Sequence, residues 1–308
     1  MTPHDYEYLR RLLKTRSGLV LSSEKHYLVE SRLLPVARRA GLFNLTGLVA
    51  KLRGPDSEQL IVEVVEAMTT NESFFFRDKI PFDHFRETIM PALLTARAAT
   101  RRVRIWCAAA ATGQEPYSLA IALKEMGKDL RGWRIEIVAT DLSTGVLEKA
   151  KSGIYSQFEV QRGLPALMLI KHFAQVGETW QIAPEIRGMV KFMPLNLLND
   201  FSHLGRFDLV LCRNVLIYFD QATKVGVLER IAGATERDGF LVLGGAETVV
   251  GLTDRFKPFP NKRGVYAQPG GMISKDMISK DMISGDAAAG SNVVSFPAPP
   301  VAAAGGAR

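Results

Sequence analysis

The sequence predicts an α/β protein built on a doubly wound, mostly parallel sheet, with an all-helical domain before it and a small β-subdomain inserted in it. From about residue 100 onward, apolar runs of strand length alternate with stretches of helical periodicity, which is typical of a parallel sheet covered on both faces. Residues 1–68 show helical spacing alone. Residues 155–189 carry too much glycine and proline for a simple connection between a helix and a strand.

The N-terminal segment predicts a small bundle of helices. Apolar residues recur at three- and four-residue spacing at Tyr6, Leu9, Leu12 and Leu13, at Leu28, Leu33 and Leu34 before Pro35, and at Leu60, Val64, Val65 and Met68. Gly18, Gly41, Gly47 and the Gly54-Pro55 pair mark breaks between the helices. We expect this domain, with the linker that follows it, to occupy residues 1–80.

The sheet domain is expected at residues 81–268. Strands are predicted at 103–109, 134–141, 190–197, 207–214 and 240–247, and helices from about residue 115, around 146–151 and at about 221–236. Pro194 indicates an early end or an edge position for its strand, because proline cannot donate to the ladder. The last helix is expected to lead through Asp238-Gly239 into the last strand.

Two segments break the alternation of strands and helices. We interpret residues 155–190 as the inserted β-subdomain. From Pro269 onward the chain runs through a five-residue repeat, MISKD, which matches neither a helix nor a coiled coil, and then through alanine, proline and glycine. We expect residues 269–308 to form a disordered, low-complexity tail.

Composition indicates an ordinary globular protein, with 308 residues, 47% of them hydrophobic. No apolar run is long enough for a transmembrane helix, and the N-terminus lacks a signal-peptide pattern. Cys107 and Cys212 lie in apolar strands, so we expect buried thiols in a reducing cytoplasm and neither a disulfide nor a metal site.

The net charge of +7 is concentrated near the N-terminus. Residues 1–55 carry ten Lys and Arg against four acidic residues. Such a segment can meet nucleic acid, anionic lipid or an acidic protein surface, or be a solvated helical surface without a partner. It has no zinc-ligand spacing and few aromatic residues for stacking on bases, which disfavours nucleic acid.

In a doubly wound sheet, ligands bind beyond the carboxyl ends of the strands. The first strand leads into AAAATGQEPYS, whose single glycine, Gly113, does not make the G-x-G-x-x-G pattern of dinucleotide sites. Glu115 follows, and an acid repels phosphate and attracts a cation or an amine. This pattern favours S-adenosylmethionine, which has an ammonium and a sulfonium group but no phosphate, over NAD and nucleoside triphosphates.

Polar residues end three further strands. Asp141 is suited to accept hydrogen bonds from ribose hydroxyls, although it could instead cap the following helix. Asn196-Leu197 and Arg213-Asn214 follow the next two strands and could meet the adenine and methionine portions of the cofactor.

The stretch TTNESFFFRD, residues 69–78, places three phenylalanines against a charged pair. Three adjacent aromatic residues fit neither an amphipathic helix nor an alternating strand. We consider two readings: Arg77 is paired with Asp78 in a buried turn, or the stretch is a wall of the ligand site.

These motifs resemble those of a known family in order and spacing. TTNESFFFRD, ATGQEPYSLA, VATDLS, NLL, FDLVLCRNVLIYF and DGFLVLGGAE are similar to the motifs of the CheR family, the S-adenosylmethionine-dependent methyltransferases that esterify glutamates of bacterial chemoreceptors. The resemblance covers about residues 1–268. It implies an N-terminal helical domain, a Rossmann-like methyltransferase domain and an inserted β-subdomain, which in several members docks on a receptor pentapeptide.

The resemblance also implies roles for individual residues. The implied cofactor site consists of Asn71, Ser73, Arg77, Glu115, Asp141, Asn196, Leu197, Arg213 and Asn214. Arg77 and Tyr218 are implied to stand beside the transferred methyl group, as catalytic residues. The basic N-terminal domain is implied to meet the receptor's methylation helices.

The sequence departs from the family pattern at three places. Ser73 stands where threonine is usual, which keeps a hydroxyl, and Gln114 replaces a common glutamate. The segment around Gln175–Trp180 lacks the glycine-arginine hairpin of members that bind the pentapeptide. We therefore expect no pentapeptide tethering.

The expected reaction needs no general base, because a glutamate is already ionised at neutral pH. The five histidines form no obvious cluster in the sequence. We expect a cytoplasmic, monomeric enzyme that acts on chemoreceptors. Two alternatives stay open: a family member that serves a non-flagellar signalling array, and a catalytically silent sensor that binds the cofactor.

Overall fold

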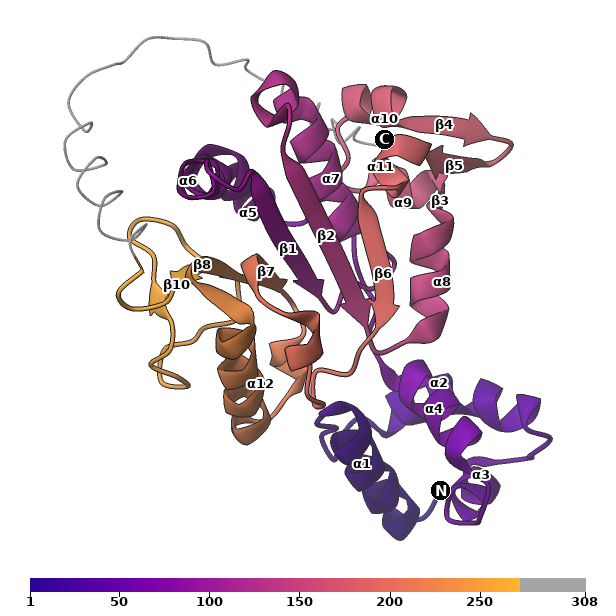
Figure 1. The fold of residues 1–308 in the computed structure, drawn as a ribbon. Coiled ribbons are helices and arrows are strands. Elements are labelled where there is room, and N and C mark those ends of the chain that lie inside the picture. The colour runs from indigo at the N-terminus through magenta and orange to yellow at the C-terminus, as the bar shows by residue number, and fades with distance from the viewer. Residues whose placement is uncertain (272–308) are drawn as a thin grey trace, which may run out of the picture.

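The computed structural model describes residues 1–271 (Figure 1). The MISKD repeat and the rest of the predicted tail after Gly271 lie outside the described residues. Within the described part of the chain, none of the helices combines the length and the apolar character that crossing a bilayer requires.

Four helices form the N-terminal unit: α1 (Pro3–Ser17), α2 (His26–Arg39), α3 (Leu45–Leu52) and α4 (Glu58–Met68). Helix α1 starts at a capping box in which Thr2 and Asp5 satisfy each other's backbone N–H groups. The apolar stripes predicted from the sequence meet in one core, where Leu9, Leu13 and Leu33 are fully buried. Figure 1 shows these helices beyond the arrowheads of β2 and β6.

The main sheet has seven strands in the order β6-β2-β1-β7-β8-β10-β9. The parallel part consists of β6 (Val190–Pro194), β2 (Arg134–Asp141), β1 (Arg102–Ala108), β7 (Phe207–Cys212) and β8 (Thr235–Leu243). The antiparallel edge consists of β10 (Val265–Ala267) and β9 (Lys257–Pro258). The chain builds outward from β1 to β6 and then returns to the other side of β1 with β7, so the topological switch point lies between β1 and β7.

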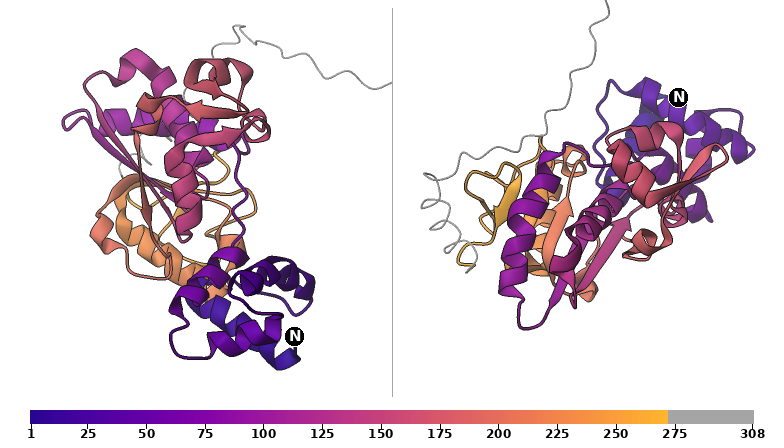
Figure 2. Two further views of the ribbon diagram at one scale, coloured as in Figure 1. Left: turned by 90° about the vertical axis from the view of Figure 1, so that its right-hand side faces the viewer. Right: turned by 90° about the horizontal axis from the view of Figure 1, so that it is seen from above.

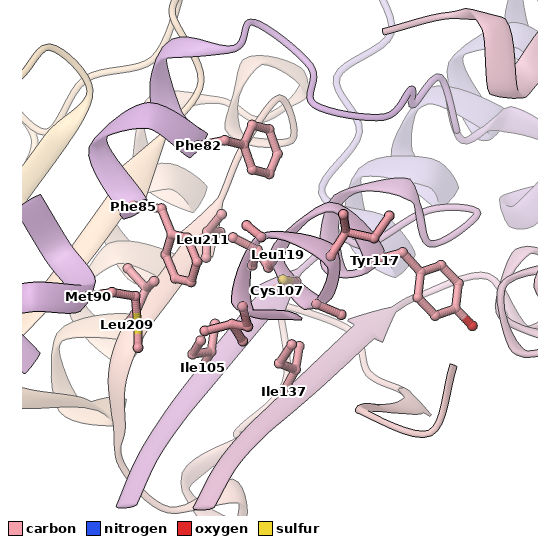
Figure 3. Close-up of a cluster of buried hydrophobic side chains, with 14 of the residues drawn as sticks. Phe82, Phe85, Met90, Ile105, Cys107, Tyr117, Leu119, Ile137, Leu209 and Leu211 are labelled. Carbon is pink, nitrogen blue, oxygen red and sulfur yellow. The ribbon is translucent and has the colours of Figure 1, made fainter. Parts of the chain in front are cut away.

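Helices cover both faces of this sheet. On one face, α7 (Gln114–Met126) packs with α5 (Ile80–His84), the π-helix η1 (Phe85–Ile89) and α6 (Met90–Ala96). Figure 3 shows Phe82, Phe85 and Met90 of these segments against strand residues such as Ile105 and Leu209. On the other face, α12 (Gln221–Ala234) covers the apolar side chains that β1 and β7 send there. The predicted doubly wound class is confirmed.

The strand boundaries differ in part from the prediction. Strand β6 lies at the sheet edge and ends at Pro194, as that proline indicated. The expected connection through Asp238-Gly239 is wrong, because both residues lie inside β8, which begins at Thr235. Arg97 binds the Asp238 carboxylate with two nitrogens, at 2.7 and 2.6 Å, and so holds this polar residue within the strand. Strands β9 and β10 were not predicted from the sequence.

The inserted segment is a subdomain of its own. Its elements are β3 (Ile154–Ser156), α9 (Gln157–Gln161), α10 (Ala166–His172), β4 (Phe173–Val176), β5 (Thr179–Ile182) and α11 (Pro184–Arg187). The strands form a separate antiparallel sheet in the order β3-β5-β4. The subdomain follows α8 (Thr144–Ser152), and the right view in Figure 2 shows it beside the main domain.

Candidate active site

A cleft opens at the carboxyl ends of β1, β2, β6 and β7, with a volume of about 970 Å³ including its mouth. Its walls also include residues 69–73 and the loop after α1. All ten residues singled out from the sequence line this cleft: Asn71, Ser73, Arg77, Glu115, Asp141, Asn196, Leu197, Arg213, Asn214 and Tyr218. The structure therefore brings together residues that are separated by up to 147 positions in the chain.

The loop after β1 brings its backbone close to the cleft. Ala109 and Ala111 both adopt left-handed conformations, with φ of 62° and 47°, which cost energy for a residue other than glycine. Gly113 has φ of 92°, and a Cβ there would lie 2.9 Å from the Cβ of Ala150. Glycine is thus required at position 113 by packing against α8, while the two alanines keep small side chains on the cleft wall.

A buried ion pair crosses the floor of the cleft. Arg213 Nη1 donates to Glu115 Oε2 at 2.7 Å, and Nη2 donates to Asp78 Oδ2 at 2.8 Å. Burial raises the pKa of Glu115 above its ordinary value, although the positive charge of Arg213 opposes the rise. Arg213 Nε is buried and has no partner among the described residues. This N–H is therefore free to donate to a ligand.

Asp141 organises the loop after β1. Its Oδ2 accepts from the backbone N–H of Ala111 at 2.8 Å, and its Oδ1 accepts from that of Ser143 at 3.0 Å. Burial raises the pKa of this carboxyl. The alternative that Asp141 caps the following helix is wrong, because the residue at the N-cap of α8 is Ser143.

The three phenylalanines of TTNESFFFRD point in different directions. Phe75 is fully buried and packs edge-on against Tyr155 and Phe173 of the inserted subdomain. Phe76 has φ of 50°, and its N–H donates to Ser118 Oγ of α7 at 2.9 Å. Phe74 lies under the guanidinium groups of Arg77 and Arg162. The segment is thereby fixed to both the insert and α7.

Arg77 is not paired with Asp78, so that alternative from the sequence is wrong. Its Nη1 donates to the carbonyl oxygen of Glu72 at 2.8 Å, and its guanidinium lies 5.5 Å from the centre of the Phe74 ring. Asp78 is instead paired with Arg213. Arg77 is thus half-buried on the cleft wall. Among the described residues its one hydrogen-bond acceptor is the carbonyl oxygen of Glu72, so its other N–H groups can donate to a ligand.

The N-terminal unit closes one side of the cleft. Ser17, the last residue of α1, and Leu19, just after this helix, line the cleft. Asn196 Nδ2 donates to the carbonyl oxygen of Arg16 at 2.7 Å, and the N–H of Val20 donates to the carbonyl oxygen of Tyr218 at 2.9 Å. Ser17 and Leu19 could not be predicted as cleft residues from the sequence, because their position depends on how the two domains dock.

The two cysteines and the five histidines do not line the cleft. Cys107 and Cys212 are buried in β1 and β7, where burial raises the pKa of each thiol well above its ordinary value. In the described part of the chain, no histidine lines the cleft. Neither residue type therefore supplies a nucleophile or a base at this site.

A cleft at the switch point of a doubly wound sheet, with two buried carboxylates and no glycine-rich phosphate loop, is typical of methyltransferases that use S-adenosylmethionine. Comparison with known protein families agrees. The family described as CheR methyltransferase, SAM binding domain matches residues 71–265, and CheR methyltransferase, all-alpha domain matches residues 4–69. The chain belongs to the CheR methyltransferase family.

Curated relatives match most of the chain. Chemotaxis protein methyltransferase 1 of Pseudomonas aeruginosa is 42% identical over 82% of this chain and 93% of its own length. Chemotaxis protein methyltransferase Cher2 of Pseudomonas putida is 37% identical over 86% of this chain and 97% of its own length. The protein is therefore a methyltransferase of chemotaxis, and the expected cofactor, S-adenosylmethionine, is confirmed.

Proposed function

We propose that the protein transfers a methyl group to glutamate side chains of chemoreceptors, giving glutamate methyl esters and S-adenosylhomocysteine. The observation that carries this proposal is the convergence of the ten residues above in one cleft, with Arg77 and Tyr218 on its wall. In this proposal the sheet domain, residues 81–268, holds the cofactor together with Asn71, Ser73 and Arg77 of the linker, and the helical part of residues 1–80 faces the receptor.

The chain's own groups fit the cofactor. We assign the cofactor site to Asn71, Ser73, Arg77, Glu115, Asp141, Asn196, Leu197, Arg213 and Asn214, all of which line the cleft. The unpartnered Nε of Arg213 can donate to a carboxylate such as that of the methionine portion, and the buried acids suit cationic groups and hydroxyls. When bound, S-adenosylmethionine supplies a methyl group on a positively charged sulfur.

The residues around the cleft then have to align and desolvate a carboxylate. An ordinary glutamate needs no deprotonation at neutral pH. Arg77 can orient that carboxylate through its guanidinium, and Tyr218 can fix its approach. Burial of Phe75 and the packing of Phe76 on Phe82 keep water from the wall behind them. Alignment of this kind can supply roughly 7–11 kcal/mol of the barrier reduction.

The partner surface that we assign to the receptor is the basic N-terminal unit. Arg11, Lys25, Arg38 and Lys51 make no salt bridge with any residue that the structure describes, so their charges are available to a partner. Receptor methylation helices are rich in Glu and Gln, as the family resemblance implies, and an acidic partner would be steered toward this surface. The substrate helices are cytoplasmic, and we place the reaction in the cytoplasm.

We further propose that no receptor pentapeptide tethers this protein. Gly177-Glu178 forms the turn between β4 and β5, where members that bind the pentapeptide carry a glycine-arginine hairpin. Titration of a receptor C-terminal pentapeptide into the full chain should give no saturable signal. Binding in the micromolar range or tighter would contradict this part of the proposal.

The direct test of the function uses receptor-containing membranes. The purified protein is incubated with these membranes and with S-adenosylmethionine that carries a tritiated methyl group. We expect label on the receptor that is released by mild base, because a glutamate methyl ester is base-labile. Membranes without receptor provide the control. Base-stable label, or label that does not depend on the receptor, would overturn the proposal.

A further inference from the structure

Glu247 lies just after β8, opposite the loop that follows β7, and its carboxylate accepts an unusual number of backbone hydrogen bonds. Its Oε2 accepts from the N–H of Asn214 at 2.8 Å and of Gly244 at 2.7 Å. Its Oε1 accepts from the N–H of Val215 at 2.9 Å and of Leu216 at 2.7 Å. The N–H of Ile217 approaches the same oxygen at 3.3 Å. Glu247 does not itself line the cleft.

The loop held by Glu247 carries residues of the proposed site at both ends. Arg213 and Asn214 stand at its start, and the single 3-10 turn Leu216–Tyr218 (η4) ends at Tyr218. Asn214 has φ of 60°, in the left-handed region that asparagine enters more readily than most residues other than glycine. Among the described residues, no other acceptor serves the N–H groups of positions 214–217. Successive N–H groups of this kind form an anion-binding concavity, which the carboxylate fills.

The glycine pair before Glu247 supports the same arrangement. A Cβ on Gly244 would lie 2.7 Å from Glu247 Oε2, 2.9 Å from Asn214 Nδ2 and 3.0 Å from the backbone nitrogen of Asn214. A Cβ on Gly245, the next residue, would meet nothing within 4 Å. Glycine is therefore required at 244 by the close approach of Glu247 and Asn214, while position 245 is open.

We propose that Glu247 is a positioning residue for methyl transfer: its carboxylate, seated in the N–H groups of residues 214–217, holds Asn214 at the cofactor and Tyr218 at the acceptor. The inference rests on the proposed function, because that assigns the roles of Asn214 and Tyr218. Glu247 touches neither the cofactor nor the acceptor and acts through the backbone of the loop.

The test compares Glu247→Gln and Gly244→Ala with Gly245→Ala as the matched control. Glutamine keeps the shape of the side chain but turns an NH₂ group toward backbone N–H groups that need an acceptor. In the receptor assay, we expect kcat to fall by about 100-fold for Glu247→Gln, since small misplacement of catalytic groups has effects of this size. KM for the receptor should stay unchanged, because the basic N-terminal unit is untouched. Gly244→Ala should behave like Glu247→Gln, and Gly245→Ala like the wild type.

A double-mutant cycle separates positioning from general damage to the fold. If Glu247 acts through Tyr218, Glu247→Gln should cost much less in a Tyr218→Phe background than in the wild type. A full, additive loss in both backgrounds would overturn the inference. So would a kcat for Glu247→Gln and Gly244→Ala within about threefold of that for Gly245→Ala, a ratio small against the roughly 100-fold effect expected.

Binding of S-adenosylhomocysteine, measured by calorimetry, is independent of the acceptor. We expect Glu247→Gln to weaken this binding by about tenfold, the effect of one lost hydrogen bond of ordinary strength at Asn214. Unchanged affinity would count against the inference. If the wild-type protein binds S-adenosylhomocysteine but does not label receptors, the proposed function is contradicted. The affinity of Glu247→Gln for S-adenosylhomocysteine then still decides whether Glu247 positions Asn214 at the cofactor.

Discussion

Arg77 and Arg162 offer a natural comparison at the scale of single residues. Both guanidinium groups lie over the ring of Phe74, at 5.5 and 4.4 Å from its centre. Arg77 also lines the cleft, whereas Arg162 is exposed outside it and pairs with Glu72. The two side chains therefore share a packing role and differ in access to the proposed acceptor.

We predict that Arg77→Ala lowers kcat of methyl transfer by about 100-fold or more, an effect typical of losing a charged group at a transition state. Arg162→Ala, which removes a guanidinium from the same ring, should keep near-wild-type turnover. Thermal melting of both variants checks that the fold is intact. Near-wild-type turnover in Arg77→Ala would remove this residue from the catalytic assignment.

Tyr218→Phe should likewise abolish most methyl transfer, because it removes the hydroxyl and leaves the ring in place. Tyr27, which is 70% exposed on α2, provides a matched substitution away from the cleft. Single-turnover measurements on Tyr218→Phe and Tyr27→Phe separate the chemical step from product release. Equal rates in the two variants would contradict a catalytic role for Tyr218.

The raised pKa of Glu115 predicts a dependence of cofactor binding on pH. Burial disfavours the charged form, so Glu115 becomes protonated at a higher pH than an ordinary glutamate as the solution is acidified. The affinity for S-adenosylmethionine should fall over that range, because the neutral acid no longer attracts a cation. The effect of Glu115 on folding stability has the opposite dependence on pH. Because its pKa is higher in the folded protein than in the unfolded chain, Glu115 stabilises the fold at low pH, and this stabilisation is lost as the pH rises.

Calorimetric titrations at a series of pH values, from about pH 8 to about pH 5, check this prediction. In Glu115→Gln the affinity should be weaker at neutral pH and should depend less on pH, because Asp141 is then the remaining buried acid with a raised pKa at the site. A wild-type affinity that is flat across the series, or that rises on acidification, would show that Glu115 does not act as an anion toward the cofactor.

At the scale of elements, the inserted subdomain supports the cleft through the stretch of three phenylalanines. Gly163, between α9 and α10, has φ of 84°, and a Cβ there would collide with the carbonyl oxygen of Phe75. Tyr155 and Phe173 hold the Phe75 ring from the same side. The insert is therefore a buttress for the wall that carries Arg77.

We predict that Gly163→Ala destabilises the protein by about 3 kcal/mol or more, combining left-handed strain with an overpacked contact. Gly177→Ala is the control, because Gly177 also has positive φ, 59°, and no atom lies within 4 Å of its Cβ position. The control should lose only the strain, about 1–2 kcal/mol. Urea unfolding measures both losses, and equal losses would show that the insert does not press on Phe75.

Elements with strong local signals could be predicted from the sequence, and those that depend on tertiary pairing could not. The apolar runs that form β1, β2 and β7, and the edge strand that ends at Pro194, could be predicted from the local sequence pattern. Strand β10 is only three residues long and pairs antiparallel with β8, so it gives no periodic signal. Asp238 has a turn-like sequence, yet Arg97, 141 positions away, holds it in a strand.

Within the site, too, features with a local sequence signal could be predicted, and features that depend on tertiary contacts could not. Residues at strand ends, such as Asp141 and Asn196, were readable because topology places such ends together. The pairing of Asp78 with Arg213, rather than with its neighbour Arg77, depends on long-range geometry. Glu247 also follows the end of a parallel strand, so a place near the other strand ends could have been predicted for it. No role was predicted for it from the sequence.

At the scale of the whole molecule, the N-terminal unit is fastened beside the reacting end of the cleft. Lys14 pairs with Asp220, the N-cap of α12, at 2.6 Å, and the N–H of Val20 donates to the carbonyl oxygen of Tyr218. A partner that docks on the basic unit would therefore arrive next to Arg77 and Tyr218.

This arrangement predicts that receptor recognition weakens with salt. KM for the receptor should rise with ionic strength while kcat stays nearly constant, because screening acts on exposed charges. Arg38→Glu and Lys51→Glu should raise KM by about 10-fold at low salt, in the range of charge reversals at steered interfaces. Lys262→Glu, beside β10 and outside the N-terminal unit, is the control. Equal effects in all three variants would exclude a specific receptor surface on the basic unit.

The most direct test of the account is a calorimetric titration of the purified protein with S-adenosylhomocysteine, with NAD and ATP titrated in parallel. We predict saturable heat for S-adenosylhomocysteine that is strongly reduced in Asp141→Asn, and none for the two phosphorylated compounds. Saturable heat with NAD or ATP and none with S-adenosylhomocysteine would contradict the assignment of the cleft.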